Sequence, residues 1–340
     1  MKLRMLLVGL LILLTTQQLI ADTSSEILNP PQSENIQTLS AVEYLNHMKT
    51  AYKQLNYELL YLDTRQNEIE PNQLIHGVVD GKEVTYFRTL NGIIREFLQF
   101  DNKISYYKQG TQPYTLLTQR DQGIFANIAN FDFEHSNKIY DYIILGKSRI
   151  AGNKAIAIRM ISKDEYRYSY IIWIDAETYL PLRLDTINHA NIIVEQIMVV
   201  SLKLNTEMNS WVAQLINKKL PETLFLKTAK ATSWKIGWLP TGFRVVKDNQ
   251  HKLLSYDTSP VSYIMLNDGM VSVSIYISLL NTVIEEKHQS VTRQGGTLLY
   301  TAHNGTIEVN IIGEIPLITA EKIAESIRPT TNDTRDRANN

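Results

Sequence analysis

The sequence predicts an α+β protein in which one large, curved antiparallel β-sheet wraps over helices and a smaller C-terminal α+β domain follows. Segments rich in aromatic and β-branched residues, typical of strands, succeed one another through most of the chain. Asp80-Gly81 and Asn91-Gly92 between such segments favour two-residue hairpins, and hence antiparallel neighbours. A length of 340 residues is comfortable for two domains.

The first 21 residues have the pattern of a secretory signal peptide. Lys2 and Arg4 precede the apolar run from Met5 to Leu14, and small and polar residues then lead to Ala21. This run is too short for a membrane-spanning helix, and no later stretch reaches the roughly 18 apolar residues that spanning requires. Residues 22–39 are polar and predict a flexible leader. We therefore expect an exported protein.

Composition excludes several kinds of site. The chain contains no cysteine, which removes disulfides, thiol nucleophiles, iron–sulfur clusters and thiolate zinc sites. The net charge is −1, and without the two basic residues of the signal peptide it is −3. A charge so close to balance argues against nucleic acid as a ligand.

The first domain is expected to cover residues 40–205. Ser40-Ala-Val-Glu43 has the spacing of a capping box, and an apolar helical stripe runs from Val42 to Leu55. Strands are then predicted at Tyr57–Leu62, Leu74–Val79, Val84–Leu90, Ile93–Phe100, Ile104–Tyr107, Tyr140–Leu145, Ala155–Ile161, Tyr166–Ile174, Leu182–Asp185 and Ile192–Leu204. The intervening stretch Gln109–Ser136 has no clear period and is expected to be irregular.

The stretch from Tyr166 to Asp185 is the most informative part of the predicted sheet. Three tyrosines alternate there with Arg167 and Ser169, which predicts a strand with one buried face, and the following Ile171–Ile174 is apolar on both faces. Asp175–Thr178 fits a tight turn. Pro181, which has no amide hydrogen, is expected at the start of the next strand.

A helix and a linker, residues 206–233, are predicted to lead into the smaller domain at residues 234–328. Hairpins are expected at Asn267-Asp-Gly269 and at His303-Asn-Gly305. Thr319 is expected to cap a closing helix. Residues 329–340 are predicted to be a disordered tail.

Catalytic and metal-binding motifs are missing from the sequence. No HExxH, GxSxG, P-loop or GxGxxG is present, and the seven histidines lack the short spacing of a zinc helix. Asp175 and Glu177 could act as paired carboxylates, but a turn explains both better. We therefore expect a binding protein rather than an enzyme, with no cofactor and no metal. An exported hydrolase would need a nucleophile and a base that the sequence does not offer.

Six segments of the sequence carry a resemblance when they are taken together and in order. They are Leu55-Asn-Tyr-Glu-Leu59, Tyr140-Asp-Tyr142 with Gly146-Lys-Ser-Arg-Ile-Ala151, Tyr166–Asp185, Trp238-Leu-Pro-Thr-Gly-Phe243, Asp268-Gly-Met-Val-Ser-Val273, and Gly313-Glu-Ile-Pro316 with Thr319-Ala320 and Ile323-Ala324. In these segments the chain resembles the RseB/MucB family of sigma-E regulatory proteins, and the resemblance spans residues 40 to 327. It implies that the large sheet is a LolA-like half-barrel.

The resemblance also implies a function. Such a protein is a periplasmic negative regulator of the sigma-E envelope-stress response. It binds the periplasmic part of a membrane anti-sigma factor and shields it from proteolysis, and lipopolysaccharide or another acyl-chain lipid releases it. The alternative is a LolA-like carrier of lipids or lipoproteins. Residues Trp234–Ile327 separate the two hypotheses, because a one-domain carrier lacks them.

Candidate binding residues follow from strand phase and from the resemblance. We expect a lipid to contact one phase of the strand predicted at Tyr166–Ile174, namely Tyr168, Tyr170, Ile172 and Ile174. The opposite phase, with Trp173, stays open because a register error of one residue exchanges the faces. A second set consists of Trp238, Pro240 and Phe243, which either pack the domain junction or contact the partner. The lipid's identity, a homo-oligomeric state, and direct competition between lipid and partner also stay open.

Overall fold

The computed structural model describes residues 39–64, 69–118, 123–224, 232–251, 261–284 and 288–330. The predicted signal peptide, the leader up to Thr38 and the tail from residue 331 lie outside the described residues. Within the described part of the chain, no helix is long and apolar enough to cross a membrane.

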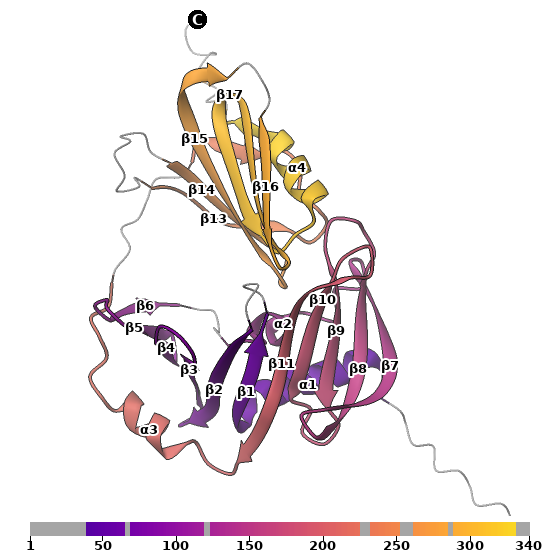
Figure 1. Cartoon of the computed structure of the whole chain (residues 1–340), viewed down its shortest axis with the longest axis vertical. Helices are drawn as coiled ribbons and strands as arrows, with labels where there is room; N and C mark the ends of the chain where they lie inside the picture. The colour runs from indigo at the N-terminus through magenta and orange to yellow at the C-terminus, as the bar shows by residue number, and fades with distance from the viewer. Residues whose placement is uncertain are drawn as a thin grey trace, which may run out of the picture. The chain divides into compact units, whose positions relative to one another are not determined.

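Eleven antiparallel strands form the large sheet that the sequence predicts (Figure 1). They are β1 (Asn56–Asp63), β2 (Glu70–Val79), β3 (Lys82–Thr89), β4 (Arg95–Phe100), β5 (Lys103–Lys108), β6 (Tyr114–Leu117), β7 (Tyr140–Ile150), β8 (Asn153–Ser162), β9 (Ser169–Asp175), β10 (Pro181–Ile187) and β11 (Ile193–Asn205). Their order is β6-β5-β4-β3-β2-β1-β11-β10-β9-β8-β7. Two meanders therefore meet where β1 pairs with β11.

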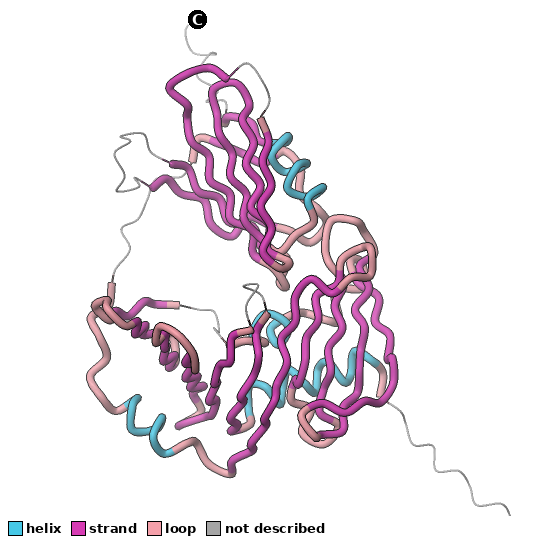
Figure 2. Tube along the Cα trace, viewed as in Figure 1, coloured by secondary structure: helices cyan, strands magenta, loops and turns pink. Residues whose placement is uncertain are grey.

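Helix α1 (Ala41–Gln54) crosses one face of this sheet, together with the short α2 (Ala126–Asn130), as Figure 2 shows. The predicted capping box is confirmed, since Ser40 Oγ accepts the Glu43 amide and Glu43 Oε2 accepts the Ser40 amide. Leu45 and Met48 of α1 are fully buried in the main core. The stretch expected to be irregular thus contains β6 and α2.

Helix α3 (Ser210–Ile216) packs on the opposite face of the sheet, over β2 to β4. Its Val212 joins Ile75, Tyr86 and Leu98 in a separate buried cluster. The Asn209 side chain caps the helix by accepting the amides of Trp211 and Val212. Adjacent residues of one strand point to opposite faces, so β2 is buried on both faces, with Leu74 in the main core and Ile75 in this cluster.

The smaller domain is a five-stranded antiparallel sheet with one packed helix. Its strands are β13 (Arg244–His251), β14 (Val261–Asn267), β15 (Ser272–Ile284), β16 (Gln289–Gln294) and β17 (Thr297–Gly313), in the order β13-β14-β15-β17-β16. Helix α4 (Leu317–Ser326) packs on β17, and β12 (Trp234–Ile236) pairs with β18 (Ile327–Pro329). The predicted fold class is confirmed.

Four local predictions are wrong. Asn91-Gly92 does not form a two-residue hairpin, because residues 90–94 separate the end of β3 at Thr89 from the start of β4 at Arg95. The strand expected from Tyr166 begins only at Ser169, and the preceding residues form a loop. His303-Asn-Gly305 is no hairpin, because β17 continues through it and changes from β16 to β15 as its neighbour. Gly305 has φ +62°, so the signal marks a distortion within one long strand. Thr319 does not cap α4, because the N-cap of this helix is Pro316. The Thr319 hydroxyl donates instead to the Tyr166 carbonyl at 2.9 Å.

Candidate functional site

A buried arginine joins the loop between β8 and β9 to the smaller domain. Arg167 is 1% exposed. Its guanidinium contacts Asp164 at 3.0 Å and Asp268, in the turn between β14 and β15, at 3.0 Å. It also donates to the Thr241 carbonyl. The alternation with tyrosines wrongly predicted a solvent-facing strand residue here, because Tyr166 to Tyr168 do not form a strand.

Asp268 is shaped to receive that guanidinium. Its Oδ1 accepts the amides of Met270 and Val271, both at 2.9 Å, which leaves Oδ2 for Arg167. Burial raises the pKa of Asp268, and the Val271 amide and the Arg167 charge oppose that rise. Removing one partner of such a buried pair leaves the other charge without compensation.

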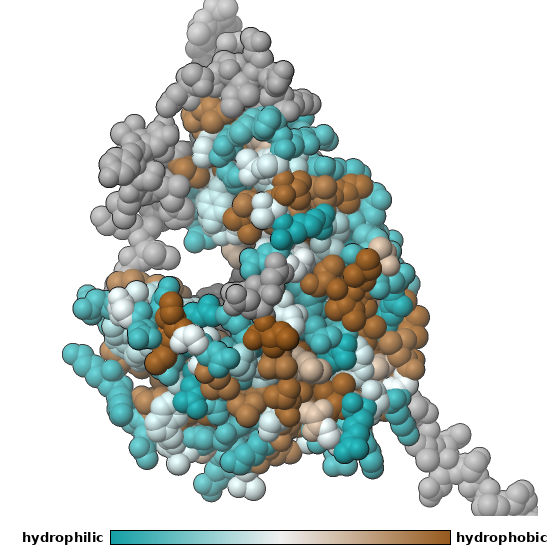
Figure 3. Space-filling model, in the orientation of Figure 1, coloured by the Kyte–Doolittle hydropathy of each residue, from teal (hydrophilic) through white to brown (hydrophobic). Residues whose placement is uncertain are grey.

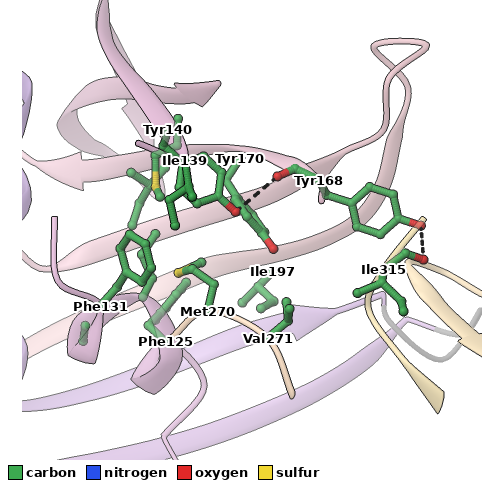
Figure 4. Close-up of a cluster of buried hydrophobic side chains, with 14 of the residues drawn as sticks. Phe125, Phe131, Ile139, Tyr140, Tyr168, Tyr170, Ile197, Met270, Val271 and Ile315 are labelled. Carbon is green, nitrogen blue, oxygen red and sulfur yellow. Dashed lines mark hydrogen bonds between the residues drawn. The ribbon is translucent and has the colours of Figure 1, made fainter. Parts of the chain in front are cut away.

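The same turn inserts two apolar side chains into the core of the large sheet (Figure 4). Met270 and Val271 are 3% and 4% exposed, in one cluster with Phe125 and Phe131. Gly269 has φ +101°, and a Cβ there would lie 3.0 Å from the Phe131 ring. Only glycine fits this position without strain.

Tyrosine hydroxyls complete the junction. Tyr168 donates to the Ile315 carbonyl at 3.1 Å, and Tyr140 donates to the Tyr168 carbonyl at 3.4 Å (Figure 4). Burial raises the pKa of both tyrosines, so the phenols remain protonated donors.

The second predicted set lies at this junction. The Trp238 ring meets the Tyr166 ring edge-on at 4.9 Å, and Lys322 of α4 bonds the Tyr166 hydroxyl and lies 5.3 Å above Trp238. Phe243 is 7% exposed, with its ring 5.6 Å from the Arg167 guanidinium. Pro240 is buried and accepts the Phe243 amide. Contact of these residues with a partner stays a prediction.

The predicted lipid-binding residues form the inner face of β9 and the loop before it. Tyr168, Tyr170, Ile172 and Ile174 are at most 3% exposed and belong to the main core. The alternative residue, Trp173, points to the outer face, where the Arg183 guanidinium lies 4.4 Å from its ring. The chosen phase is therefore the buried one, and these side chains fill the core. Their contact with a lipid stays a prediction.

The outer face of the half of the sheet formed by β7–β11 is also rich in apolar side chains, as the sequence predicts for Ile171–Ile174. Figure 3 shows hydrophobic residues gathered along these strands. Ile143, Leu145 and Val200 are 47%, 51% and 46% exposed.

The other half of the sheet contains an open cavity of about 270 Å³ between β3–β5 and α3. Its lining residues are Tyr86, Glu96, Leu98, Tyr107, Trp211, Leu215, Lys218, Lys219 and Leu220. The Tyr86 and Trp211 rings meet edge-on at 4.8 Å, and the Tyr86 hydroxyl donates to Glu96 at 2.9 Å. Apolar walls with two exposed lysines can hold an acyl chain and an attached anionic group.

A row of aromatic rings crosses the face of β3–β6 that is opposite to α3. Phe87 stacks on Phe97 at 5.0 Å, Phe97 lies 6.3 Å from Tyr106, and Tyr106 lies 5.4 Å from Tyr114. All four rings are half-buried. Such a row offers flat apolar surfaces to an acyl chain or an extended peptide.

Sequence reasoning missed Arg167, Asp268, Lys322 and Trp211. The motif Asp268–Val273 was a usable signal for one of them, because an aspartate before Gly-Met-Val predicts a turn whose side chain bonds nearby amides. The other three depend on contacts between residues far apart in sequence. Among the described residues, no group of three His, Asp or Glu side chains could hold a metal.

Comparison with known families covers both domains. Residues 40–223 match the MucB/RseB N-terminal domain, and residues 228–328 match the MucB/RseB C-terminal domain.

Individual relatives agree with this match. The sigma-E factor regulatory proteins RseB of Salmonella typhimurium and Escherichia coli are each 30% identical to this chain, over 84% of it and 89% of the relative. A crystal structure of MucB in complex with MucA(peri) shares the fold, with a TM-score of 0.68 and 24% identity over 86% of this chain and all of that one.

Proposed function

Because this chain belongs to the MucB/RseB family, we propose that it is a negative regulator of a sigma-E-type envelope-stress response. It acts in the periplasm, where it binds the periplasmic part of a membrane-bound anti-sigma factor and shields that segment from proteolysis. The observation that carries the proposal is the match of both domains in one chain. The MucB structure with MucA(peri) supports the choice of partner.

The proposed task is binding rather than catalysis. The junction supports it, because the Arg167 ion pairs and the inserted Met270 and Val271 hold the two domains together. A partner segment can then meet both domains at once without the cost of ordering them.

Lipid is the proposed release signal, and the cavity beneath α3 is its proposed site. Apolar walls would take part of an acyl chain, and Lys218 and Lys219 would meet phosphate groups such as those of lipopolysaccharide. A lipid that prefers the partner-free protein weakens partner binding by the same factor by which the partner weakens lipid binding. Tyr168, Tyr170, Ile172 and Ile174 belong to the core of the other half of the same sheet, and their contact with a lipid stays a separate prediction.

The test is binding of the chain from residue 22 onward to the periplasmic segment of the organism's own anti-sigma factor, with and without lipopolysaccharide. We expect micromolar or tighter binding that lipopolysaccharide weakens. Retained lipid binding without any partner binding would favour the lipid-carrier hypothesis instead.

A variant pair tests the lipid site. Leu215→Glu places a carboxylate in the cavity and should reduce lipid binding roughly tenfold or more, because a charge in an apolar site is costly to desolvate. Gln214→Glu adds the same charge to an exposed position of the same helix and should leave lipid binding unchanged. Equal affinities for the two variants would exclude this cavity.

A further inference from the structure

The turn between β3 and β4 is apolar where a hairpin turn in water is normally polar. Residues 90–94 read Leu-Asn-Gly-Ile-Ile, and Gly92 supplies the positive φ of +68°. Leu90, Ile93 and Ile94 are 42%, 60% and 52% exposed. Large aliphatic side chains that gather in the open at one turn are typical of an interaction site.

A fourth aliphatic side chain joins them. The Leu90 amide donates to the Pro71 carbonyl at 2.9 Å, which places the start of β2 beside this turn. Ile69, two residues before Pro71, is 68% exposed. We call Ile69, Leu90, Ile93 and Ile94 the apolar tip.

Several backbone polar groups at the tip are paired within the protein. Thr89 Oγ1 donates to the Ile93 carbonyl and accepts the Arg95 amide, both at 3.1 Å. The Ile94 carbonyl accepts the Gln109 amide at 3.0 Å. Each backbone group that is paired in this way lowers the cost of placing the turn in an apolar medium.

Basic residues stand directly behind the tip on three neighbouring strands. They are Arg88 on β3, Arg95 on β4 and Lys108 on β5, and Arg95 and Lys108 are paired in register. Arg95 forms an ion pair with Glu70 at 2.7 Å. Arg88 and Lys108 are exposed and form no ion pair with any described residue. We call these three residues the basic collar. Because only Arg95 is paired with a carboxylate of a described residue, the collar keeps a net positive charge.

We propose that the apolar tip and the basic collar form a docking site for an anionic bilayer surface. The aliphatic side chains lie outermost and enter the boundary between headgroups and acyl chains, while the collar meets the lipid phosphates behind them. The apolar tip followed by the cations matches the bilayer, in which the acyl chains lie beneath the layer of phosphates. This site goes beyond the proposed function, which requires a protein segment and a single lipid but no membrane surface.

Vesicle co-sedimentation tests the proposal with the chain from residue 22 onward. Vesicles of phosphatidylglycerol and phosphatidylcholine in equal parts should bind the protein, and vesicles of phosphatidylcholine alone should bind it much less. Binding should weaken as salt rises, because the collar's attraction is screened. Binding to neither vesicle, or equally to both, would overturn the proposal.

Variants locate the contact. The double variant Ile93→Asp with Ile94→Asp should lower vesicle binding roughly tenfold or more, since it removes the inserted groups. Lys108→Glu should lower it on the order of fivefold or more. The matched controls are Leu279→Asp, at a residue 55% exposed on β15, and Lys147→Glu, at an exposed residue of β7; both should bind like the unaltered chain.

Two readouts distinguish contact with a bilayer from contact with a protein or with a single lipid in the cavity. Ile93→Trp should show blue-shifted emission with anionic vesicles, and Leu279→Trp should not. Leu215→Glu, in the cavity beneath α3, should leave vesicle binding unchanged. If the tip variants lost binding to the anti-sigma segment while keeping vesicle binding, the tip would be a protein contact and the proposal would be wrong.

Discussion

The two halves of the large sheet differ in how completely their faces are covered by the rest of the protein. Around β7–β11 the inner face is closed by α1, by α2 and by Met270 and Val271 of the smaller domain, and the buried charges of Arg167 and Asp268 are paired. Around β2–β6 the protein leaves a cavity of about 270 Å³, a half-buried aromatic row and an apolar tip. The inner face of the first half holds the domains together, and the second half offers a cavity and a half-buried aromatic row to ligands.

Among the variants of the β7–β11 half, Arg167→Met should lower the free energy of unfolding most. It leaves Asp268 buried without its cation, so we expect a loss of about 3 to 5 kcal/mol in the free energy of unfolding. Chemical denaturation of the full chain measures this loss. Adding Asp268→Asn should recover part of it.

Arg88→Met is the matched control on the other half. Its side chain is exposed, and it should change the free energy of unfolding by no more than about 0.5 kcal/mol. Equal losses for Arg167→Met and Arg88→Met would contradict the contrast between the halves.

Gly269→Ala probes the turn that enters the core. With φ +101° and the Phe131 ring 3.0 Å from a new Cβ, we expect a loss on the order of 1 to 3 kcal/mol in unfolding free energy. Gly81→Ala, at φ +74° in open space on the other half, should cost only about 1 kcal/mol. Thermal unfolding of the two variants side by side gives the comparison, and a larger loss for Gly81→Ala would count against it.

Tyr168→Phe should lower the free energy of unfolding less than Arg167→Met and Gly269→Ala do. It removes the hydrogen bond to the buried Ile315 carbonyl and should cost about 1 to 2 kcal/mol of unfolding free energy. Tyr106→Phe keeps the ring of the half-buried aromatic row and should be near neutral for stability. Denaturation midpoints measure both variants, and indistinguishable midpoints would mean that the Tyr168 hydroxyl does not stabilise the junction.

Sequence patterns predicted most of the strands because alternation and Asn-Gly or Asp-Gly pairs are local. The capping box follows from the spacing of Ser40 and Glu43, and the strand start follows from Pro181 alone; both predictions are confirmed. His303-Asn-Gly305 misled for the same reason, since a local turn signal does not reveal that β17 is one long strand that pairs first with β16 and then with β15.

The candidate site was less accessible to sequence reasoning. Strand phase placed Tyr168, Tyr170, Ile172 and Ile174 on one face, and that face is the inner one. Strand phase does not tell whether an inner face is filled by other side chains or left open to a ligand. Filling depends on Met270 and on α2, which reach this core from distant parts of the sequence. The cavity likewise depends on α3 folding back over β3–β5.

Hydrogen–deuterium exchange of the chain from residue 22 onward, with and without lipopolysaccharide, tests the contrast between the halves most directly. We predict that lipopolysaccharide protects amides of β3–β5 and α3 and leaves residues 164–168 and 267–271 unchanged. Protection confined to residues 168–174, with none at α3, would contradict the contrast.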